Sequence, residues 1–166
     1  MQLAAIANLS HPFLSQLERG RARPSMVSLE KIARALGSSQ LEIIAAAEDE
    51  NGSPDQPDTV LVRANEGTRG GYGDGQGRLL VHGDRSFHPM EYVGEKQEPG
   101  NFYEHAGAEF IHVVSGVVAV DLEGREVSIL HPGDSLYFDG GIRHRWYAAA
   151  PGGYRLFVVK AKPEHG

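Results

Sequence analysis

The sequence contains no cysteine, which excludes disulfide bonds, zinc fingers and thiol catalysis. It also lacks an apolar run long enough to span a membrane, and no signal-peptide pattern opens the chain. These absences predict a protein of the reducing cytoplasm that has no membrane partner.

Positive charge is scarce as well. The net charge is -6 over 166 residues, which on its own does not indicate a nucleic-acid-binding protein. Residues 1–50 hold five Lys or Arg against six Asp or Glu, and three of these acids fall at 48–50. Any DNA-binding surface must therefore be a local patch, with modest affinity per subunit and a steep dependence on salt.

What is present divides into a helical part, a linker and a β-rich part. Apolar residues recur at helical spacing from Leu29 to Leu36, and Gly37 ends that helix. Pro24 marks the end of the preceding segment, and Ser25 marks the start of this helix. Residues 48–58 read EDENGSPDQPD, an acidic stretch with two prolines and no large apolar residue, which is typical of a linker. We therefore expect an all-α domain at 1–47, a linker at 48–58 and a further domain at 59–166.

Beyond residue 59, short β-branched and aromatic runs alternate with glycine turns, without intervening helices. This pattern predicts a β-sandwich or small barrel, and so an α+β protein of two domains. The expected strands lie at 59–64, 77–83, 110–116, 117–124, 126–130, 135–141 and 154–162. The glycine-rich run at 67–77 lacks the Gly-Lys-Ser/Thr of a phosphate loop and no helix follows it, so we interpret it as a flexible loop over the barrel mouth, or a mobile lid.

The most informative stretch is SHPFLSQLERGRARPS, residues 10–25. Asn8 stands where the chain must turn sharply, Ser10 is a good N-cap, and Pro12 falls in the first helical turn. One side of the helix is apolar, while the other is polar with arginines close by, as a helix in a DNA groove requires. The residues expected to contact DNA are His11, Pro12, Phe13, Ser15, Gln16, Arg19, Arg21 and Arg23.

The segment LSQLERGRARPS (14–25) resembles the recognition helix and following loop of the XRE (lambda-repressor-like) helix-turn-helix family. The helices expected at 25–37 and 38–46 follow at that family's spacing, so the resemblance covers residues 2–46. Family members carry a further first helix upstream. The resemblance therefore implies a domain that is incomplete at its N-terminus, through a mis-assigned start, a fragment or a truncation.

Two patterns in the β-rich part carry potential metal chemistry. On an extended strand Tyr103, His105 and Glu109 share parity, so all three can point to one face. A second run, from Gly133, ends at His144. Two imidazoles and a carboxylate that converge inside a barrel form a facial set for a divalent ion such as Fe, Mn, Ni or Zn.

These patterns resemble the two motifs of the cupin family, whose fold is a double-stranded β-helix or jelly-roll barrel. The resemblance covers about residues 78–159. It places His105, Glu109 and His144 on metal-ligand positions. Tyr103 stands in place of the first histidine, where it can ligate Fe(III) or donate a hydrogen bond. The effector pocket implied by the resemblance contains Tyr103, His105, Glu109 and His144.

Alternatives remain open for individual side chains. The cluster can instead hold an organic ligand by hydrogen bonds alone. His112 has the opposite strand parity and His131 precedes a turn, so an ordinary strand residue and a solvent-facing residue are expected there. One of His82 and His88 can line the pocket. Arg143 and Arg145 are expected to be surface or interface charges. Core positions are expected for Tyr137, Phe138 and Trp146.

The combination of the two parts resembles a family of bacterial transcriptional regulators. It implies a homodimer through the cupin domain, a palindromic operator in double-stranded DNA and a small-molecule effector in the barrel. Catalysis is not the favoured hypothesis. The alternative from another class is a mononuclear iron enzyme similar to the phosphonate epoxidases, which share this arrangement. A third is a ligand-binding cupin with a vestigial helical part.

Overall fold

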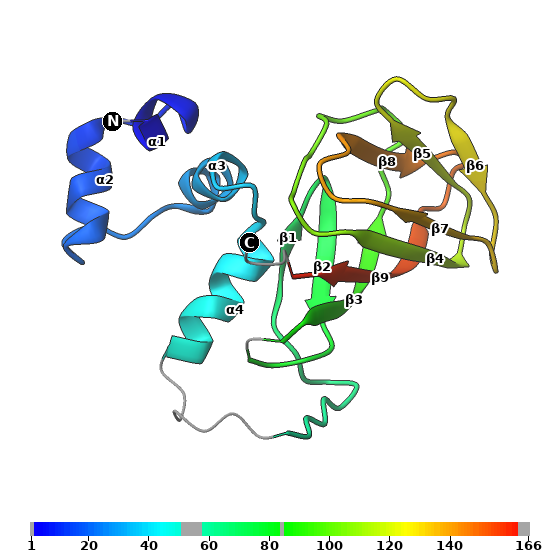
Figure 1. The fold of residues 1–166 in the computed structure, drawn as a ribbon, viewed down its shortest axis with the longest axis horizontal. Coiled ribbons are helices and arrows are strands. Elements are labelled where there is room, and N and C mark those ends of the chain that lie inside the picture. The colour runs from blue at the N-terminus through cyan, green and yellow to red at the C-terminus, as the bar shows by residue number, and fades with distance from the viewer. Residues whose placement is uncertain (1, 51–57, 84, 163–166) are drawn as a thin grey trace.

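The computed structural model describes residues 2–50, 58–83 and 85–162, and within them four helices precede nine strands (Figure 1). This order agrees with the predicted α+β organisation. None of the described helices is long and apolar enough to cross a membrane. The helices are α1 (Gln2–Ile6), α2 (His11–Glu18), α3 (Met26–Ala35) and α4 (Gln40–Glu50).

Local signals fix the ends of these helices. Asn8 adopts φ 50° in the turn between α1 and α2, and the Ser10 hydroxyl accepts a hydrogen bond from the Phe13 N–H at 3.3 Å. Ser25 caps α3 in the same way through the Ser28 N–H at 3.1 Å. Gly37 follows α3 with φ 64°. The turn, cap and stop predictions at these positions are confirmed, because each depends on one residue and its near neighbours.

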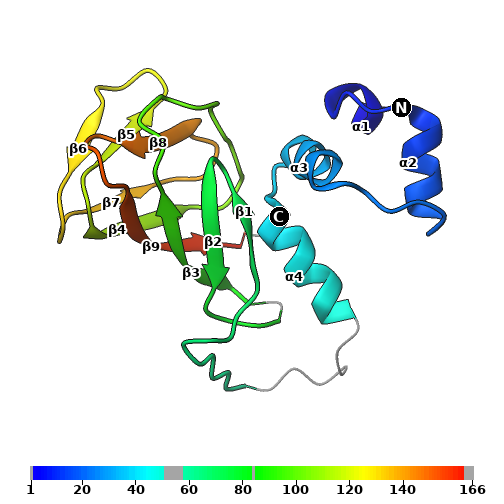
Figure 2. The same ribbon diagram turned by 180° about the vertical axis from the view of Figure 1, so that it is seen from behind.

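Helix α4 continues to Glu50, so it includes the first three residues of the stretch predicted to be a linker. Residues 51–57, most of that predicted linker, lie outside the described residues. The helix begins at a reciprocal cap, in which the Ser39 N–H donates to Glu42 Oε2 at 2.9 Å and the Glu42 N–H donates to Ser39 Oγ at 3.1 Å. Figures 1 and 2 show α4 alongside β1 and β2, so it joins the helical part to the barrel.

The strands form two antiparallel sheets. A six-stranded sheet has the order β1-β2-β3-β9-β4-β7, and a three-stranded sheet has the order β6-β5-β8. Buried side chains of both sheets, among them Met90, Ile111 and Val158, form one apolar cluster. The strands are β1 (Arg69–Tyr72), β2 (Gly75–Leu79), β3 (Phe87–Gly94), β4 (Glu109–Ser115), β5 (Val118–Leu122), β6 (Ser128–Leu130), β7 (Ser135–Phe138), β8 (His144–Ala148) and β9 (Tyr154–Ala161).

Residues 59–64 were predicted to form a strand, and this prediction is wrong. The segment has no strand structure, and Leu61 is 67% exposed. Two of its carbonyl groups instead bind a side chain: Arg78 Nη1 donates to the carbonyl oxygens of Arg63 and Ala64, both at 3.3 Å. The guanidinium that binds this turn is itself paired with Glu91 at 2.8 Å.

The prediction of a flexible loop or lid at 67–77 is also wrong. The run forms the β1–β2 hairpin, in which Gly70 pairs with Gly77 and Tyr72 with Gly75. Glycine has low strand propensity, so composition alone favours a loop. Helix α4 packs against the hairpin, a contact that no local pattern reveals.

The core prediction is correct for two of three aromatic residues. Phe138 and Trp146 are 3% and 9% exposed. Tyr137 is 60% exposed, and its hydroxyl donates to Asp139 Oδ1 at 2.9 Å. Because neighbouring residues of a strand point to opposite faces, Tyr137 and Phe138 cannot both face the core.

Candidate functional site

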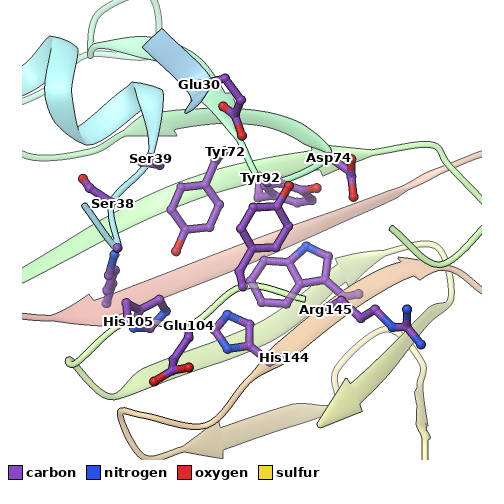
Figure 3. Close-up of a pocket in the computed structure, with 15 residues that line it drawn as sticks. Glu30, Ser38, Ser39, Tyr72, Asp74, Tyr92, Glu104, His105, His144 and Arg145 are labelled. Carbon is purple, nitrogen blue, oxygen red and sulfur yellow. The ribbon is translucent and has the colours of Figure 1, made fainter. Parts of the chain in front are cut away.

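The strongest candidate site is a buried cluster of His105, Glu109 and His144 inside the barrel. Their ligand atoms all lie within 4.8 Å of one another. His105 Nε2 lies 2.7 Å from Glu109 Oε2, and His144 Nε2 lies 3.3 Å from the same oxygen. Glu109 is fully buried at the start of β4, and His105 lies in the loop that precedes β4. His144 is the first residue of β8. Figure 3 shows the two imidazole rings side by side at the pocket wall.

The residues reach this geometry without sharing one strand, so the predicted common strand for Tyr103, His105 and Glu109 is wrong. Tyr103 forms an isolated bridge with His144, and only Glu109 belongs to a strand. The chain bends between His105 and Glu109, where His105 Nδ1 contacts the carbonyl oxygen of Gly107 at 2.7 Å. The bend brings His105 back over the carboxylate.

Both imidazoles are held in the orientation that a metal ligand needs. His105 Nδ1 contacts a backbone carbonyl, as does His144 Nδ1 with Ile142 O at 2.8 Å. A carbonyl only accepts, so each Nδ1 carries the proton and each Nε2 faces Glu109. The two Nε2 atoms and the carboxylate oxygen converge within 4.8 Å of one another, as the ligands of one metal ion do. The donor set therefore fits a divalent ion.

The environment also keeps His144 in its neutral form. Burial lowers the pKa of His144 below its usual value, and the Glu109 carboxylate only partly opposes this effect. A neutral imidazole is the form that binds a metal ion.

Tyr72 is a site residue that the sequence analysis did not identify. Its hydroxyl, on β1, donates to the second oxygen of Glu109 at 2.8 Å, and its ring is 6% exposed. Burial, together with the Glu109 charge, raises the pKa of Tyr72 well above its usual value, so the phenol stays protonated and donates. Such an outer hydrogen bond fixes the orientation of a ligand.

Replacing Tyr72 by phenylalanine is expected to weaken divalent-metal binding by roughly 10-fold, because Glu109 loses the donor that orients it. Titration with Co²⁺, followed by its visible absorption, measures this change. Tyr154 is the matched control, since it is also a buried tyrosine but makes no contact with Glu109. Equal metal affinities for the Tyr72→Phe and Tyr154→Phe variants would contradict the assigned role.

The pocket next to this cluster has walls from both parts of the chain. Ser38 and Ser39 of the α3–α4 turn line it together with barrel residues (Figure 3). The Tyr103 hydroxyl accepts a hydrogen bond from Arg34 Nη2 of α3 at 2.9 Å. Residues lining the pocket are Glu30, Gly37, Ser38, Ser39, Tyr72, Gly73, Asp74, Tyr92, Tyr103, Glu104, His105, His144, Arg145, Trp146 and Lys160.

Other predicted positions have different surroundings. Arg145 lines the pocket but is bound to Asp121 at 2.7 Å, and Arg143 pairs with Glu123 at the surface. His112 contacts Ser135 Oγ at 2.8 Å on its strand, and His131 is exposed. Both His82 and His88 line a second, open groove beside α4, which also reaches His105 and Lys160.

A buried ion pair joins α4 to the barrel beside the site. Lys160 Nζ lies 2.7 Å from Glu42 Oε1, and Lys160 is 7% exposed. Burial alone would raise the pKa of Glu42. The Lys160 ammonium and the hydroxyls of Ser38 and Ser39 outweigh it, so the pKa lies below its ordinary value of 4.5. The folded state is therefore stabilised by this group above pH 4.5, and the stabilisation is lost as the pH falls through the lowered pKa.

Glu42→Gln is accordingly expected to reduce the free energy of unfolding at neutral pH. Its effect should be smaller at an acidic pH below the lowered pKa of Glu42, where the wild-type carboxylate is protonated. Urea unfolding at the two pH values measures the difference. The exposed Glu104 supplies the control, because Glu104→Gln should change stability little at either pH. A cost for Glu42→Gln that does not vary with pH would rule out a contribution from the ion pair.

The predicted DNA-contacting residues lie on and just after α2, which Figure 1 shows far from the barrel. His11, Pro12 and Gln16 are exposed, and Phe13 and Ser15 are half-buried. The three arginines after the helix are all exposed. Leu14 is 8% exposed on the opposite side of the helix and holds it to its neighbours.

Comparison with known proteins identifies both parts of the chain. A helix-turn-helix family model matches residues 2–43, and a cupin domain model matches residues 90–160. The HTH-type transcriptional regulator PuuR of Escherichia coli (strain K12) is 24% identical over 157 residues, which span 92% of this chain and 81% of that protein.

Solved structures share the fold. An HTH_3 family transcriptional regulator from Vibrio cholerae has a TM-score of 0.60 at 20% identity, covering 98% of this chain and 85% of that one. The hydroxypropylphosphonic acid epoxidase from S. wedmorenis has a TM-score of 0.54 at 22% identity, covering 95% of this chain and 86% of that one. At these identities the likeness concerns the fold.

Proposed function

We propose that this chain is a transcriptional regulator in which an XRE-type helix-turn-helix domain is joined to a cupin domain, and that a ligand in the cupin barrel controls its binding to operator DNA. The observation that carries this proposal is the composite pocket. It places the α3–α4 turn of the DNA-binding domain against the same cavity as His105 and His144. A ligand there contacts both domains at once, which is what a sensor requires.

The proposed DNA-binding surface is the exposed side of α2 and the loop that follows it. Gln16 can form two hydrogen bonds to an adenine edge, and His11 can reach a base or a phosphate. Arg19, Arg21 and Arg23 are exposed and suited to phosphate contacts. Pro12, Phe13 and Ser15 complete the surface. Because a regulator of this kind acts on DNA within the cell, we place it in the cytoplasm.

The proposed ligand site contains Tyr103 with the metal cluster. We propose that His105, Glu109 and His144 hold a divalent ion, with Fe, Mn, Ni and Zn as candidates for an N and O ligand set. Bound there, the ion would offer open coordination positions to a small molecule. Neighbouring groups orient the three proposed ligands: the Tyr72 hydroxyl donates to Glu109, and two backbone carbonyl groups hold the imidazoles.

We also propose a homodimer through the cupin domain, and the outer face of the six-stranded sheet supports it. Phe110 lies opposite Tyr137 and beside Val159, and Val159 lies opposite Pro89. Phe110 and Tyr137 are 36% and 60% exposed, so this apolar row crosses four strands in contact with solvent. A twofold assembly lets two α2 helices meet successive major grooves.

Replacing Phe110 by glutamate is expected to convert the dimer to a monomer, since two charges would meet at the twofold interface. Sedimentation velocity measures the mass in solution. Ile129→Glu provides the control, because Ile129 is 51% exposed on the other sheet. A Phe110→Glu protein that remains dimeric would exclude this face as the interface.

The regulator proposal is tested by fluorescence anisotropy of the full chain on DNA taken from upstream of its own coding sequence. Specific binding that survives an excess of scrambled DNA is the expected result. Failure to discriminate between the two DNAs would overturn the proposal. The enzyme hypothesis is not favoured, since the regulator PuuR matches 92% of this chain whereas the epoxidase likeness is one of fold.

A further inference from the structure

Three glycines of the β1–β2 hairpin, Gly70, Gly71 and Gly77, lie against α4, and the helix occupies space that their side chains would need. A Cβ atom on Gly77 would lie 2.7 Å from Leu41 Cδ2, and one on Gly71 would lie 2.9 Å from Gln40 Oε1. Leu41 is fully buried and belongs to the apolar cluster of the barrel. We call this contact between α4 and the hairpin the α4 seat, with Leu41, Gly70, Gly71 and Gly77 as its residues.

The α4 seat is connected to both domains. Gln40 Nε2 donates to the Met26 carbonyl oxygen at 2.9 Å, which ties the start of α4 to the start of α3. On the other side, the hairpin strand β1 carries Tyr72, which orients Glu109. Any movement of α4 on the hairpin therefore moves the DNA-binding domain relative to the strand that supports the metal cluster.

Two polar contacts beside the seat end next to metal-cluster residues. Lys160, the partner of Glu42, is the cross-strand neighbour of Glu109. Tyr103, the acceptor for Arg34, exchanges both backbone hydrogen bonds with His144, at 2.8 and 2.9 Å. These two contacts connect the helical domain to the site at separate points.

We propose that the α4 seat is a releasable latch between the domains, and that a divalent ion in the barrel favours the seated position. The charges indicate which position of α4 a bound cation favours. Seated, the Glu42 carboxylate neutralises the Lys160 ammonium beside Glu109. Released, the ammonium loses its partner and repels a cation at the cluster. By linkage, an ion that binds better to the seated form stabilises that form. The inference rests on the proposed function only in assigning a ligand to the barrel.

The test uses a side chain that is too large for the seat. Gly77→Val adds a branched residue that suits a strand but collides with Leu41, while Gln76→Val adds the same residue at the exposed neighbouring position. The chain has no cysteine, so Glu18→Cys and Glu126→Cys accept a spin-label pair without background labelling. The two labels report the distance between α2 and the far end of the barrel.

The distance distribution is expected to broaden for Gly77→Val and to stay narrow for Gln76→Val. The Kd for Zn²⁺, by calorimetry, should rise about fivefold or more, the lower end of typical coupling between sites. Adding Leu41→Ala to Gly77→Val removes as many carbon atoms as the valine adds. The double variant should therefore recover the narrow distance distribution and the wild-type Kd for Zn²⁺. Should Gly77→Val lose its far-ultraviolet circular dichroism, Leu41→Asn, which leaves the hairpin sequence intact, repeats both measurements.

Two results would overturn the inference. A narrow distribution in both seat variants would show that α4 is not released. A broad distribution with an unchanged Zn²⁺ Kd would show that release and metal binding are independent. Neither measurement uses DNA, so a chain that binds no operator would refute the proposed function and still leave the latch testable.

Discussion

Replacement of Glu109 by glutamine is expected to remove divalent-metal binding while the barrel stays folded. Glu109 supplies the negative charge among the three ligands, and its Oε2 faces the Nε2 atoms of both histidines, at 2.7 and 3.3 Å. An amide of the same shape keeps the packing but offers no charge to a cation. Because outer partners of metal ligands already contribute roughly 10–100-fold to affinity, the loss of this ligand should exceed about 100-fold.

Two measurements check this expectation. Co²⁺ titration gives the affinity, and thermal unfolding with excess Zn²⁺ gives the stabilisation by bound metal, about 2.7 kcal/mol at a concentration 100 times the Kd. Both signals should vanish in Glu109→Gln and persist in Glu126→Gln, which alters an exposed carboxylate at the far end of the barrel. Undiminished Co²⁺ affinity in Glu109→Gln would show that Co²⁺ binds without Glu109 and would contradict the assignment of this residue as a metal ligand.

Sequence reasoning succeeded where one residue and its near neighbours decide the structure. Asn8, Ser10 and Gly37 each determine a turn or a helix end through backbone conformation or a local hydrogen bond. Strands with strong apolar alternation, such as β4 and β9, were recognisable for the same reason. The histidines and the carboxylate of the cluster were accessible because their spacing is a recognisable motif.

Sequence reasoning failed where contacts between segments far apart in the sequence determine the structure. The glycine-rich hairpin packs against α4, and Tyr72 donates a hydrogen bond to Glu109 across 37 positions in the sequence. The contact between Arg34 and Tyr103 spans 69 positions. A tyrosine within a glycine-rich run gives no local sign of a buried partner. The error at Tyr137 was avoidable, since strand alternation with the buried Phe138 already assigns it to the outer face.

Simultaneous replacement of Arg19, Arg21 and Arg23 by alanine is expected to have the largest effect on DNA binding. All three are exposed, and within the described part of the chain none takes part in a salt bridge, so they are available to phosphates. Each phosphate contact contributes about 0.9 to the slope of log K against log salt. The triple variant should therefore bind far more weakly at low salt, with a slope shallower by up to about 3 per subunit.

Gln16→Ala separates reading of sequence from attraction to the backbone. A glutamine that bonds an adenine edge should contribute about 1–3 kcal/mol of discrimination at one base pair, with no change in the salt slope. Anisotropy titrations at several salt concentrations measure both quantities. Arg125→Ala, on an exposed turn of the barrel, is the control and should change neither. If the triple variant kept the wild-type slope, the loop after α2 would not face the phosphates, and the groove-reading surface would have to lie elsewhere on the helical domain.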